Sequence, residues 1–346
     1  MLERWMDLLK KSLHILRFGY APSMGEARLS RLEPEDLQDV KSFFKMPKFF
    51  IFGHARSGTT LLARLIRVHP EVHCNWQSHF FTREPTLFAL VDREDVRKWL
   101  HHSSFRWNHG EELAPKVIRV VADFIMEREA RQQGKSIVGD KSPNNYMPGK
   151  SVSMLHEVYP DGKLIFIIRD GRDTVLSHRF QNFIDFPEYL SGEDLQIRDD
   201  FSEDPEPFYN GERSIFTEKW LQNDIQSWVQ NVQETTDVGR QLFSDQFKTI
   251  KYEELLVEPT KQMNALWAFL GADLDQQNLS EAISREIDRN PDADWQKSQN
   301  AQMLENLEKG KSGSWQALFT RRDRQIVKDA AGETLIRWGY EDGLAW

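Results

Sequence analysis

The sequence predicts an α/β fold, with three layers (α/β/α) around a central, mainly parallel sheet. Apolar runs of strand length alternate with helical patterns over most of the 346 residues, and this alternation is typical of a parallel sheet covered by helices. Hydrophobic residues make up 39% of the chain and include 11 Trp and 22 Phe, which can fill a substantial core. The length suits one large domain of this class.

Short apolar runs bounded by structure-breaking residues predict four strands. In chain order these are residues 49–52, 136–138, 164–168 and 247–252. Helical periodicity predicts helices at residues 59–68, 173–180, 220–235, 260–270 and 321–338. The first of these helices must end before Pro70, because the residue preceding a proline is driven out of the helical conformation.

We expect one domain over residues 46–346, preceded by a helical extension over residues 1–45. In that extension, apolar residues recur at the spacing of an amphipathic helix: Leu2, Trp5, Met6, Leu9, Leu13 and Leu16. Such a helix packs on the protein's own core or, alternatively, binds a partner or a membrane surface. Residues 183–211 carry nine acidic side chains opposed only by Arg198, and their prolines and glycines argue against regular structure. This segment is either a solvated insertion or a lid over the site.

Charge and cysteine content exclude several classes of protein. The formal net charge of −9 argues against nucleic-acid binding and against binding to anionic membranes. No segment approaches the roughly 20 apolar residues of a membrane helix, and the N-terminus lacks the apolar run of a signal peptide. Cys74 is the single cysteine, so no intrachain disulfide can form. We therefore expect a cytoplasmic protein, a monomer or homodimer, without an integral membrane segment.

The remaining candidate ligands do not suggest a metal site. His69 and His73 have the i, i+4 spacing of a helical zinc pair, but Pro70 lies between them and no matching carboxylates accompany them. We expect Cys74 to be a small buried residue rather than a nucleophile.

The stretch at residues 49–62 combines a strand, a loop bounded by glycines and the start of a helix. Gly53 and Gly58 allow the tight path of such a loop, and the helix start directs backbone N–H groups and the positive end of a dipole at one point. Arg56 adds a forked cation suited to phosphate or sulfate. Three hydroxyl donors follow: Ser57, Thr59 and Thr60. We interpret the stretch as an oxyanion site; the alternative is a generic strand–turn–helix joint.

This loop departs from the consensus of nucleotide triphosphatases, G-x-x-x-x-G-K-[ST]. Gly53 and Gly58 keep the spacing, but Thr59 occupies the position of the lysine that reaches the terminal phosphates. The cation stands inside the loop instead, at Arg56. The departure weakens the interpretation as a kinase or a nucleotide triphosphatase, which stays an alternative.

Residues 163–177 follow the same physical pattern. A buried strand ends in Arg169, a turn follows, and a helix carries Ser177. Because ligands of parallel sheets collect beyond the carboxyl ends of the strands, we expect Arg169 and Ser177 close to the first loop. Taken alone, the charged residues at 169–173 would be interpreted as a surface ion-pair cluster.

Together these motifs resemble those of sulfotransferases that use 3'-phosphoadenosine 5'-phosphosulfate (PAPS). Residues 56–60 resemble the 5'-phosphosulfate loop in the form seen in tyrosylprotein and many bacterial members, whereas cytosolic members usually carry lysine where Arg56 stands. In the family, an arginine at a strand end and a serine eight residues later bind the 3'-phosphate, and Arg169 and Ser177 have this spacing. The resemblance runs from about residue 49 to about residue 338 and implies a fold similar to that of P-loop nucleotide kinases.

Two further segments extend the resemblance and its cofactor-binding set. Tyr252 stands in a stretch that resembles the family's strand with its Tyr-Glu-Asp/Glu sequence. Residues 308–320 resemble the Arg-Lys-Gly loop and the run after it that cover the 3'-phosphate in cytosolic members. Glu308 replaces the arginine, so the charge of this loop must come from its other residues. The loop residues expected to bind are Lys309, Gly310 and Lys311.

Sulfuryl transfer requires an acceptor in line with the leaving group and cations that stabilise the charge of the transferred group. Lys141 lies in a stretch that resembles the Glu/Asp-Lys-Ser/Thr-Pro run of heparan-type sulfotransferases, where the lysine is catalytic or binds substrate. The resemblance therefore implies a role for Lys141 beside Arg56. Without it, Lys141 would be interpreted as an ordinary exposed lysine. Because sulfate carries less charge than phosphate, we expect no metal requirement.

The sequence departs most from the family at the residue that acts as general base. The family often shows His-Pro-Asp/Glu-Val followed by a catalytic glutamate, and here Gln77 falls at that glutamate. An amide accepts no proton, so the usual base is absent, although Gln77 can still orient the acceptor. His79 on the same segment is the best substitute, since related heparan enzymes carry a histidine there. The alternative is a structural histidine that holds a loop.

The sequence thus predicts a PAPS-dependent sulfotransferase that modifies a hydroxyl or amine on a small molecule, a glycan or a lipid. The acidic segment weighs slightly against a polyanionic glycan, because like charges repel. Two alternatives stay open: a kinase or nucleotide triphosphatase, and a nucleotide-binding homologue that has lost the base.

Overall fold

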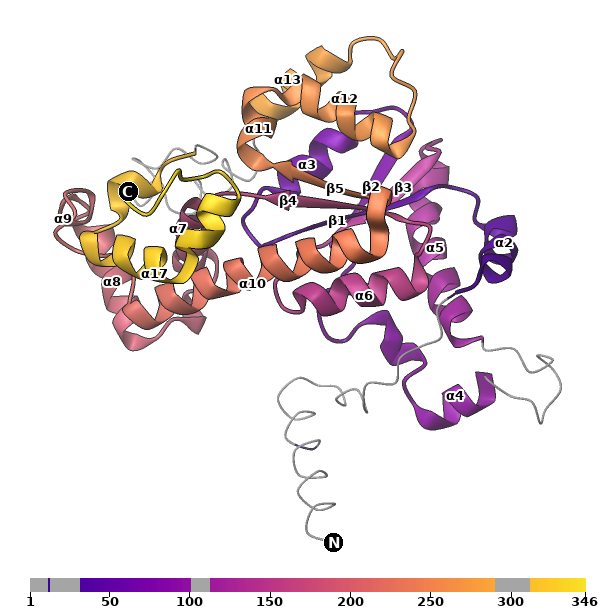
Figure 1. Cartoon of the computed structure of the whole chain (residues 1–346), viewed down its shortest axis with the longest axis horizontal. Coiled ribbons are helices and arrows are strands. Elements are labelled where there is room, and N and C mark those ends of the chain that lie inside the picture. Colours follow the sequence, from indigo (N-terminus) through magenta and orange to yellow (C-terminus); the bar gives the residue numbers. More distant parts are fainter. Residues whose placement is uncertain (1–11, 13–31, 101–112, 290–311) are drawn as a thin grey trace, which may run out of the picture.

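A parallel sheet of five strands in the order β2-β3-β1-β4-β5 forms the centre of the computed structural model (Figure 1). The structure describes residues 12, 32–100, 113–289 and 312–346. The strands are β1 (Lys48–Gly53), β2 (Val72–Trp76), β3 (Ile137–Lys141), β4 (Lys163–Ile168) and β5 (Phe247–Lys251). The predicted fold class is confirmed, and each of the four predicted strands overlaps a strand of this sheet.

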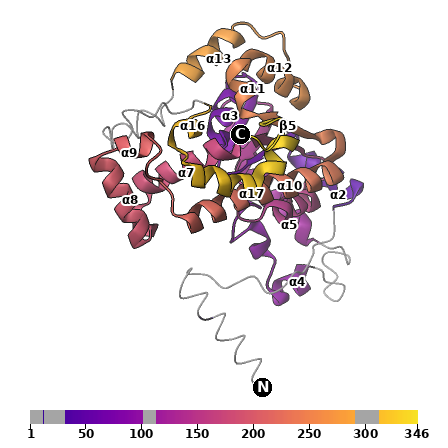
Figure 2. The same ribbon diagram turned by 60° about the vertical axis from the view of Figure 1, so that its left-hand side comes forward.

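Helices cover both faces of the sheet (Figures 1 and 2). The α-helices are α2 (Pro34–Phe43), α3 (Thr59–Ile66), α4 (Glu94–Leu100), α5 (Ala114–Gln132), α6 (Pro148–Val158), α7 (Gly171–Asp185), α8 (Gly192–Glu203), α9 (Glu206–Tyr209), α10 (Glu218–Phe243), α11 (Tyr252–Val257), α12 (Pro259–Leu270), α13 (Leu279–Asp288), α16 (Trp315–Leu318) and α17 (Arg321–Arg337). Short 3-10 turns are η1 (Leu87–Leu90), η2 (Pro187–Tyr189) and η3 (Ser244–Gln246). All five predicted helices are present, as α3, α7, α10, α12 and α17.

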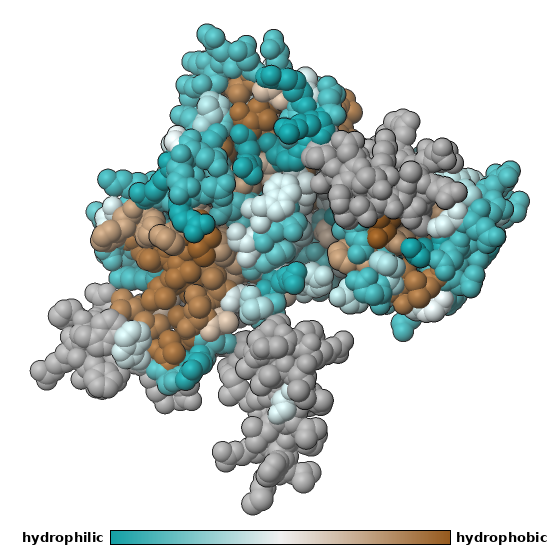
Figure 3. Space-filling view, turned by 180° about the vertical axis from the view of Figure 1, so that it is seen from behind, coloured by the Kyte–Doolittle hydropathy of each residue, from teal (hydrophilic) through white to brown (hydrophobic). Residues whose placement is uncertain are grey.

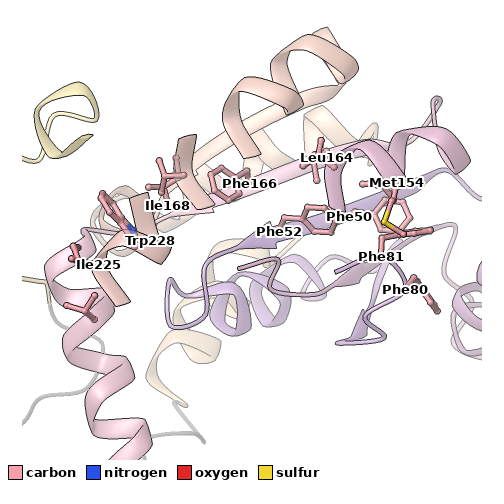
Figure 4. Close-up of a cluster of buried hydrophobic side chains, with 14 of the residues drawn as sticks. Phe50, Phe52, Phe80, Phe81, Met154, Leu164, Phe166, Ile168, Ile225 and Trp228 are labelled. Atoms are coloured by element: carbon pink, nitrogen blue, oxygen red, sulfur yellow. The ribbon is translucent and has the colours of Figure 1, made fainter. Parts of the chain in front are cut away.

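The core has two halves because successive residues of a strand point to opposite faces of the sheet. Phe50 and Phe52 belong to the half that α5, α6 and α10 cover, and Figure 4 shows them in the same cluster as Trp228 of α10. Phe49 and Ile51 belong to the half under α3 and α12. Strand β1 is buried along its whole length, so the loop that follows it starts from a rigid element.

Strand β2 is the strand that the sequence did not predict. Within the part of the chain that the structure describes, it pairs with β3 alone, at one edge of the sheet. Its residues include the polar His73 and Asn75, which interrupt the apolar run that identifies an inner strand. The omission matters, because β2 leads directly into Gln77 and His79.

The expectation that residues 183–211 lack regular structure is wrong. The end of α7 and the elements η2, α8 and α9 lie in this range. Pro187 and Gly192 are the first residues of η2 and α8, a position where the missing N–H of a proline or the missing side chain of a glycine costs little. Proline and glycine therefore mark helix starts here.

The same segment also packs on the rest of the chain. Phe201 is buried, and Arg179 of α7 forms a buried ion pair with Asp194, with 2.7 Å between Nη2 and Oδ1. Arg213, just beyond the segment, pairs with Asp200. Basic residues outside the segment thus offset part of its charge. Its possible role as a lid stays a prediction.

Helix α5 has an unusual distribution of side chains. Its outward side carries Val120, Phe124 and Ile125, of which 39%, 56% and 40% is exposed. The surface on the far side of Figure 1 includes an extended hydrophobic area (Figure 3). The buried side of α5 mixes apolar residues with charged ones. Both sides are therefore mixed, and the periodicity that identifies an amphipathic helix is weak.

A network of buried charges lies between α5 and the start of the sheet. The ammonium of Lys48 lies 2.8 Å from Oε1 of Glu127 and 3.5 Å from Oδ1 of Asp123. The guanidinium of Arg119 pairs with Asp123 at 3.0 Å and with Asp161 at 2.8 Å. These buried charges are tolerated because each has a partner of opposite sign.

Replacing Lys48 with Met should lower the free energy of unfolding by about 1.5–3 kcal/mol, because it removes a charged hydrogen-bond partner from Glu127, whose one remaining ion pair among the described residues is with Arg131. Urea unfolding followed by circular dichroism measures the change. The matched control is Lys45→Met on an exposed lysine, with an expected change within about 0.5 kcal/mol. Equal changes in the two variants would show that Lys48 contributes only as a surface charge.

Helix α2 lies inside the expected extension, residues 1–45, whereas the amphipathic pattern from Leu2 to Leu16 falls outside the described residues. Among the described residues, none of the helices has both the length and the apolar character needed to cross a membrane.

Candidate functional site

The carboxyl ends of the parallel strands meet at one edge of the sheet, and the predicted site residues follow them. The loop at residues 54–58 connects β1 to α3, and β1 lies between β3 and β4. Lys141 ends β3, Arg169 follows β4, and Tyr252 follows β5. Residues far apart in the sequence are therefore neighbours at this edge, as expected for a ligand site of a parallel sheet.

The loop after β1 has the geometry of an anion cradle. Arg56 and Gly58 have positive φ values of 71° and 88°, which turn successive N–H groups toward one side. A Cβ atom on Gly58 would lie 2.2 Å from Cδ2 of Tyr252, so only glycine fits beneath this ring. The hydroxyl of Ser57 is buried and has no hydrogen-bond partner among the described residues. A buried hydroxyl of this kind is normally satisfied, and an anion bound in the loop would supply the missing partner.

Arg56, Arg169 and Ser177 are brought together, as their motifs predicted. Nε of Arg56 donates to Oγ of Ser177 at 3.2 Å, and Nη1 of Arg169 donates to the backbone carbonyl of Arg56 at 3.2 Å. The guanidinium of Arg169 also lies 4.8 Å from the ring centroid of Tyr252. Two guanidinium groups, a hydroxyl and an aromatic ring thus converge from the ends of β1, β4 and β5.

Lys141 is fully buried, in contrast to an ordinary surface lysine. Its ammonium lies 3.5 Å from the hydroxyl of Thr60 in the first turn of α3. It also lies 4.3 Å from the ring centroid of Trp76, a residue that is half-exposed. Thr59, the residue at the consensus lysine position, is buried. A cation from the neighbouring strand thus reaches the start of α3, where the consensus places its lysine.

Gln77 and His79 lie on a bent segment that the end of β3 holds in place. Both have positive φ values, 54° and 51°. The backbone N–H of Gln77 donates to the carbonyl of Lys141 at 2.8 Å, and that of His79 donates to Oγ of Ser142 at 2.9 Å. Asp140 accepts from the N–H of Ser78 at 3.0 Å and from the hydroxyl of Ser142 at 2.6 Å. The chain therefore places both candidates beside Lys141.

The environment of His79 sets its protonation state. Burial lowers the pKa of His79 to about 4, and the positive charges of Arg83 and Lys141 act in the same direction. Nδ1 lies 2.7 Å from the hydroxyl of Thr82. At neutral pH the imidazole is therefore neutral and has a lone pair for accepting a proton. The hydrogen bond to Thr82 also fits the structural alternative.

Other residues singled out in the sequence lie elsewhere. Nε2 of His69 is 2.7 Å from the carbonyl of Asp273, and Nε2 of His73 is 2.9 Å from Oδ1 of Asn75. Cys74 is buried, and burial raises the pKa of its thiol; this confirms the expectation of a small buried residue. The expected loop residues Lys309, Gly310 and Lys311 fall outside the described residues.

Two acidic residues matter to the site although the sequence did not single them out as site residues. Asp140 holds the segment of His79, as described above. Asp173 accepts from the backbone N–H groups of Gly313 and Trp315 and so connects the start of α7 to a distant part of the chain. The available signal was their position, since each lies within four residues of a predicted site cation.

The sequence model of the sulfotransferase family matches residues 47–276, which is more than half of the chain. Protein-tyrosine sulfotransferase A of Caenorhabditis elegans is 26% identical over 84% of this chain and 61% of its own length. The Drosophila melanogaster protein-tyrosine sulfotransferase is 24% identical over 70% of this chain and 42% of its own. Mouse heparan sulfate glucosamine 3-O-sulfotransferase 3B1 is 21% identical over 69% and 51%. The chain thus spans less than two thirds of each of these relatives.

The chain is also similar to solved structures of sulfotransferases. A sulfotransferase from Alicyclobacillus acidocaldarius is 19% identical, over 78% of this chain and 98% of that one, with a TM-score of 0.39. A mouse sulfotransferase in complex with adenosine 3',5'-bisphosphate (PAP) is 17% identical, over 88% and 90%, with a TM-score of 0.43. The match to the family's sequence model, over all five strands and the loops at their carboxyl ends, shows that this chain belongs to the sulfotransferase family.

Proposed function

We propose that the protein transfers a sulfuryl group from PAPS to a hydroxyl or amine acceptor. The observation that carries the proposal is the contact of Arg56 with Ser177 and of Arg169 with the loop of Arg56. PAPS carries a phosphate at the 3' position of its ribose and a phosphosulfate at the 5' position, so it requires two anion sites side by side. The neighbouring motifs at residues 54–58 and 169–177 support the proposal that they form these two sites.

The residues at the site fit such a ligand. The loop at 54–58, with the buried hydroxyl of Ser57, is suited to the 5'-phosphosulfate. Arg169 and Ser177 are suited to the 3'-phosphate, since a guanidinium and a hydroxyl are strong donors to phosphate oxygens. The ring of Tyr252 closes the space behind Gly58. PAPS supplies the activated sulfuryl group when it is bound.

Four side chains are proposed to take part in the transfer. Arg56 and the buried Lys141 stabilise negative charge on the transferred and leaving oxygens, and their effect is strong because water is excluded from Lys141. The neutral imidazole of His79 accepts the proton of the acceptor at its free nitrogen, and Gln77 orients that acceptor. We infer that the transfer needs no metal ion, because these cations offset the charge.

The acceptor is proposed only by its reacting group. The relatives named above modify protein tyrosine and heparan glucosamine by their names, and both reactions take a hydroxyl. The half-exposed Trp76 beside Lys141 offers an apolar surface for a small molecule or for part of a glycan, lipid or peptide. A kinase is disfavoured, since Thr59 stands where the consensus requires lysine.

Calorimetric titration with PAP tests the proposal, with ATP and magnesium as the comparison ligand. We expect PAP to bind tightly and Arg169→Ala to weaken it roughly 10- to 100-fold, the value of a lost hydrogen bond to a charged group. The control Arg198→Ala changes a surface arginine that donates to the carbonyl of Phe183 and should bind PAP as the wild type does. Binding of ATP with magnesium and no response to PAP would favour the kinase alternative.

A further inference from the structure

Arg172 lies in the first turn of α7, between the two residues assigned to the 3'-phosphate, yet its side chain is engaged elsewhere. The guanidinium donates to the carboxylate of Asp170, with 2.7 Å between Nη2 and Oδ2. It lies against two indole rings that pack edge to face, 4.0 Å from the centroid of Trp315 and 4.6 Å from that of Trp346. It also forms an ion pair with Glu341. Arg172 is almost completely buried by these partners.

Residues 338–346, here called the tail segment, contact the start of α7 a second time. The hydroxyl of Tyr340 donates to Oε2 of Glu253 at 3.1 Å, and Oε1 of Glu253 accepts from the backbone N–H of Asp170 at 3.0 Å. The carbonyl of Tyr340 accepts from Arg172 at 3.4 Å. The tail segment therefore fixes the peptide unit that directly follows Arg169.

Asp173 provides an independent connection at the same place. Its two carboxylate oxygens accept from the backbone N–H of Gly313 at 2.6 Å and from that of Trp315 at 3.1 Å. The carboxylate is buried, so each of these hydrogen bonds replaces a contact with water. Gly313–Trp315 is thereby attached to the first turn of α7.

These contacts lie between Arg169 and Ser177 along the chain. Both residues belong to the strand end and the first two turns of α7, and an α-helix transmits a shift of its first turn to the turns that follow. The partners of Arg172 lie in the tail segment and α16 rather than in the loop at 54–58. Among these partners, Arg172 therefore adjoins Arg169 and Ser177 along the chain without contacting the loop at 54–58.

We propose that Arg172 and Asp173 are positioning residues for the 3'-phosphate. Through the tail segment and Gly313–Trp315, they hold the start of α7 so that Arg169 and Ser177 face the phosphate together. The inference rests on the proposed use of PAPS. It assigns to residues 338–346, which the family match does not include, a part in cofactor recognition.

Glu341→Ala in the full chain tests the proposal, because it removes the ion pair with Arg172 and leaves Arg172 itself unchanged. Titration compares PAP with adenosine 5'-monophosphate, which lacks the 3'-phosphate. We expect PAP to bind roughly three- to thirtyfold more weakly, and the monophosphate to bind as it does to the wild type. The direction is informative, because removing a negative charge would by itself strengthen the binding of an anion.

Asp342→Ala is the matched control, since this exposed carboxylate is the next residue and its removal changes the net charge equally. We expect no loss of PAP affinity in the control and a smaller loss in Glu341→Gln, which keeps an acceptor for Arg172. Equal PAP affinities in Glu341→Ala and the control would overturn the positioning role, and so would an equal loss for both ligands. A wild type that binds no PAP would instead overturn the proposed function itself.

Discussion

Lys141→Met should lower kcat by about 100- to 1,000-fold, the effect of removing one preorganised group that stabilises charge in a transition state. The affinity for PAP should change far less. Methionine matches the lysine side chain up to its last carbon and lacks only the ammonium, so the substitution removes the charge and little of the packing. Radiolabelled PAPS measures the transfer, with the best acceptor from a screen of phenols, sugars and peptides.

The large expected effect follows from the position of the ammonium. It is buried between Thr60 and Trp76, and a charge acts more strongly where water does not screen it. Lys135→Met is the control, because Lys135 precedes the opposite end of the same strand and its ammonium donates to the carbonyl of His69 at 3.1 Å. We expect its kcat to stay close to that of the wild type. A folded Lys141→Met protein with unchanged kcat but weak PAP binding would make Lys141 a binding residue instead.

The cofactor side of the site could be predicted from the sequence because its signals are local. An apolar strand, a glycine-bounded loop and a helix start follow one another within residues 49–62. A parallel sheet then brings such loops to one edge without further information. The contact between Arg56 and Ser177, 121 residues apart, follows from two local motifs and the topology of the sheet.

Other parts could not be predicted because their reasons are tertiary. Strand β2 is an edge strand with polar residues, and the charged side chains that α5 buries have further partners, Lys48 and Asp161, that are distant in the sequence. In residues 183–211, proline and glycine begin helices rather than prevent them. The positions of Asp140 and Asp173 depend on backbone N–H groups, which carry no sequence signal.

The acceptor side was ambiguous in the sequence for a chemical reason. An amide at position 77 removes the usual base, and a histidine two residues later is either a base or a structural residue. The structure makes both possible, because it leaves His79 neutral and beside Lys141 and also bonds it to Thr82. The pH dependence of the reaction separates these roles.

His79→Ala should lower kcat/KM by about 100- to 10,000-fold, the usual contribution of a general base. The acid limb of the wild-type profile should lie at about pH 4 rather than near 6.5. The sign follows from the lowered pKa of His79: the imidazole is active when neutral, stays neutral above pH 4, and is protonated only as the pH falls through that value. Initial rates from pH 3 to 9, with intrinsic fluorescence as a check of folding, measure the profile.

Arg83→Ala tests whether the acid limb of the pH profile belongs to His79. It removes a positive charge that lowers the pKa of His79, so the limb should move to higher pH while the plateau rate stays similar. A limb that does not move belongs to another group.

Gln77→Glu in the His79→Ala background tests the segment itself, because a carboxylate at position 77 restores the base that the family usually carries there. We expect part of the rate to return, with an acid limb set by the new carboxylate. An unchanged rate in His79→Ala would make this histidine structural, a residue that holds the loop through Thr82. PAP binding without transfer in the wild type, followed by transfer in Gln77→Glu, would identify the natural protein as a nucleotide-binding homologue whose single missing function is proton acceptance.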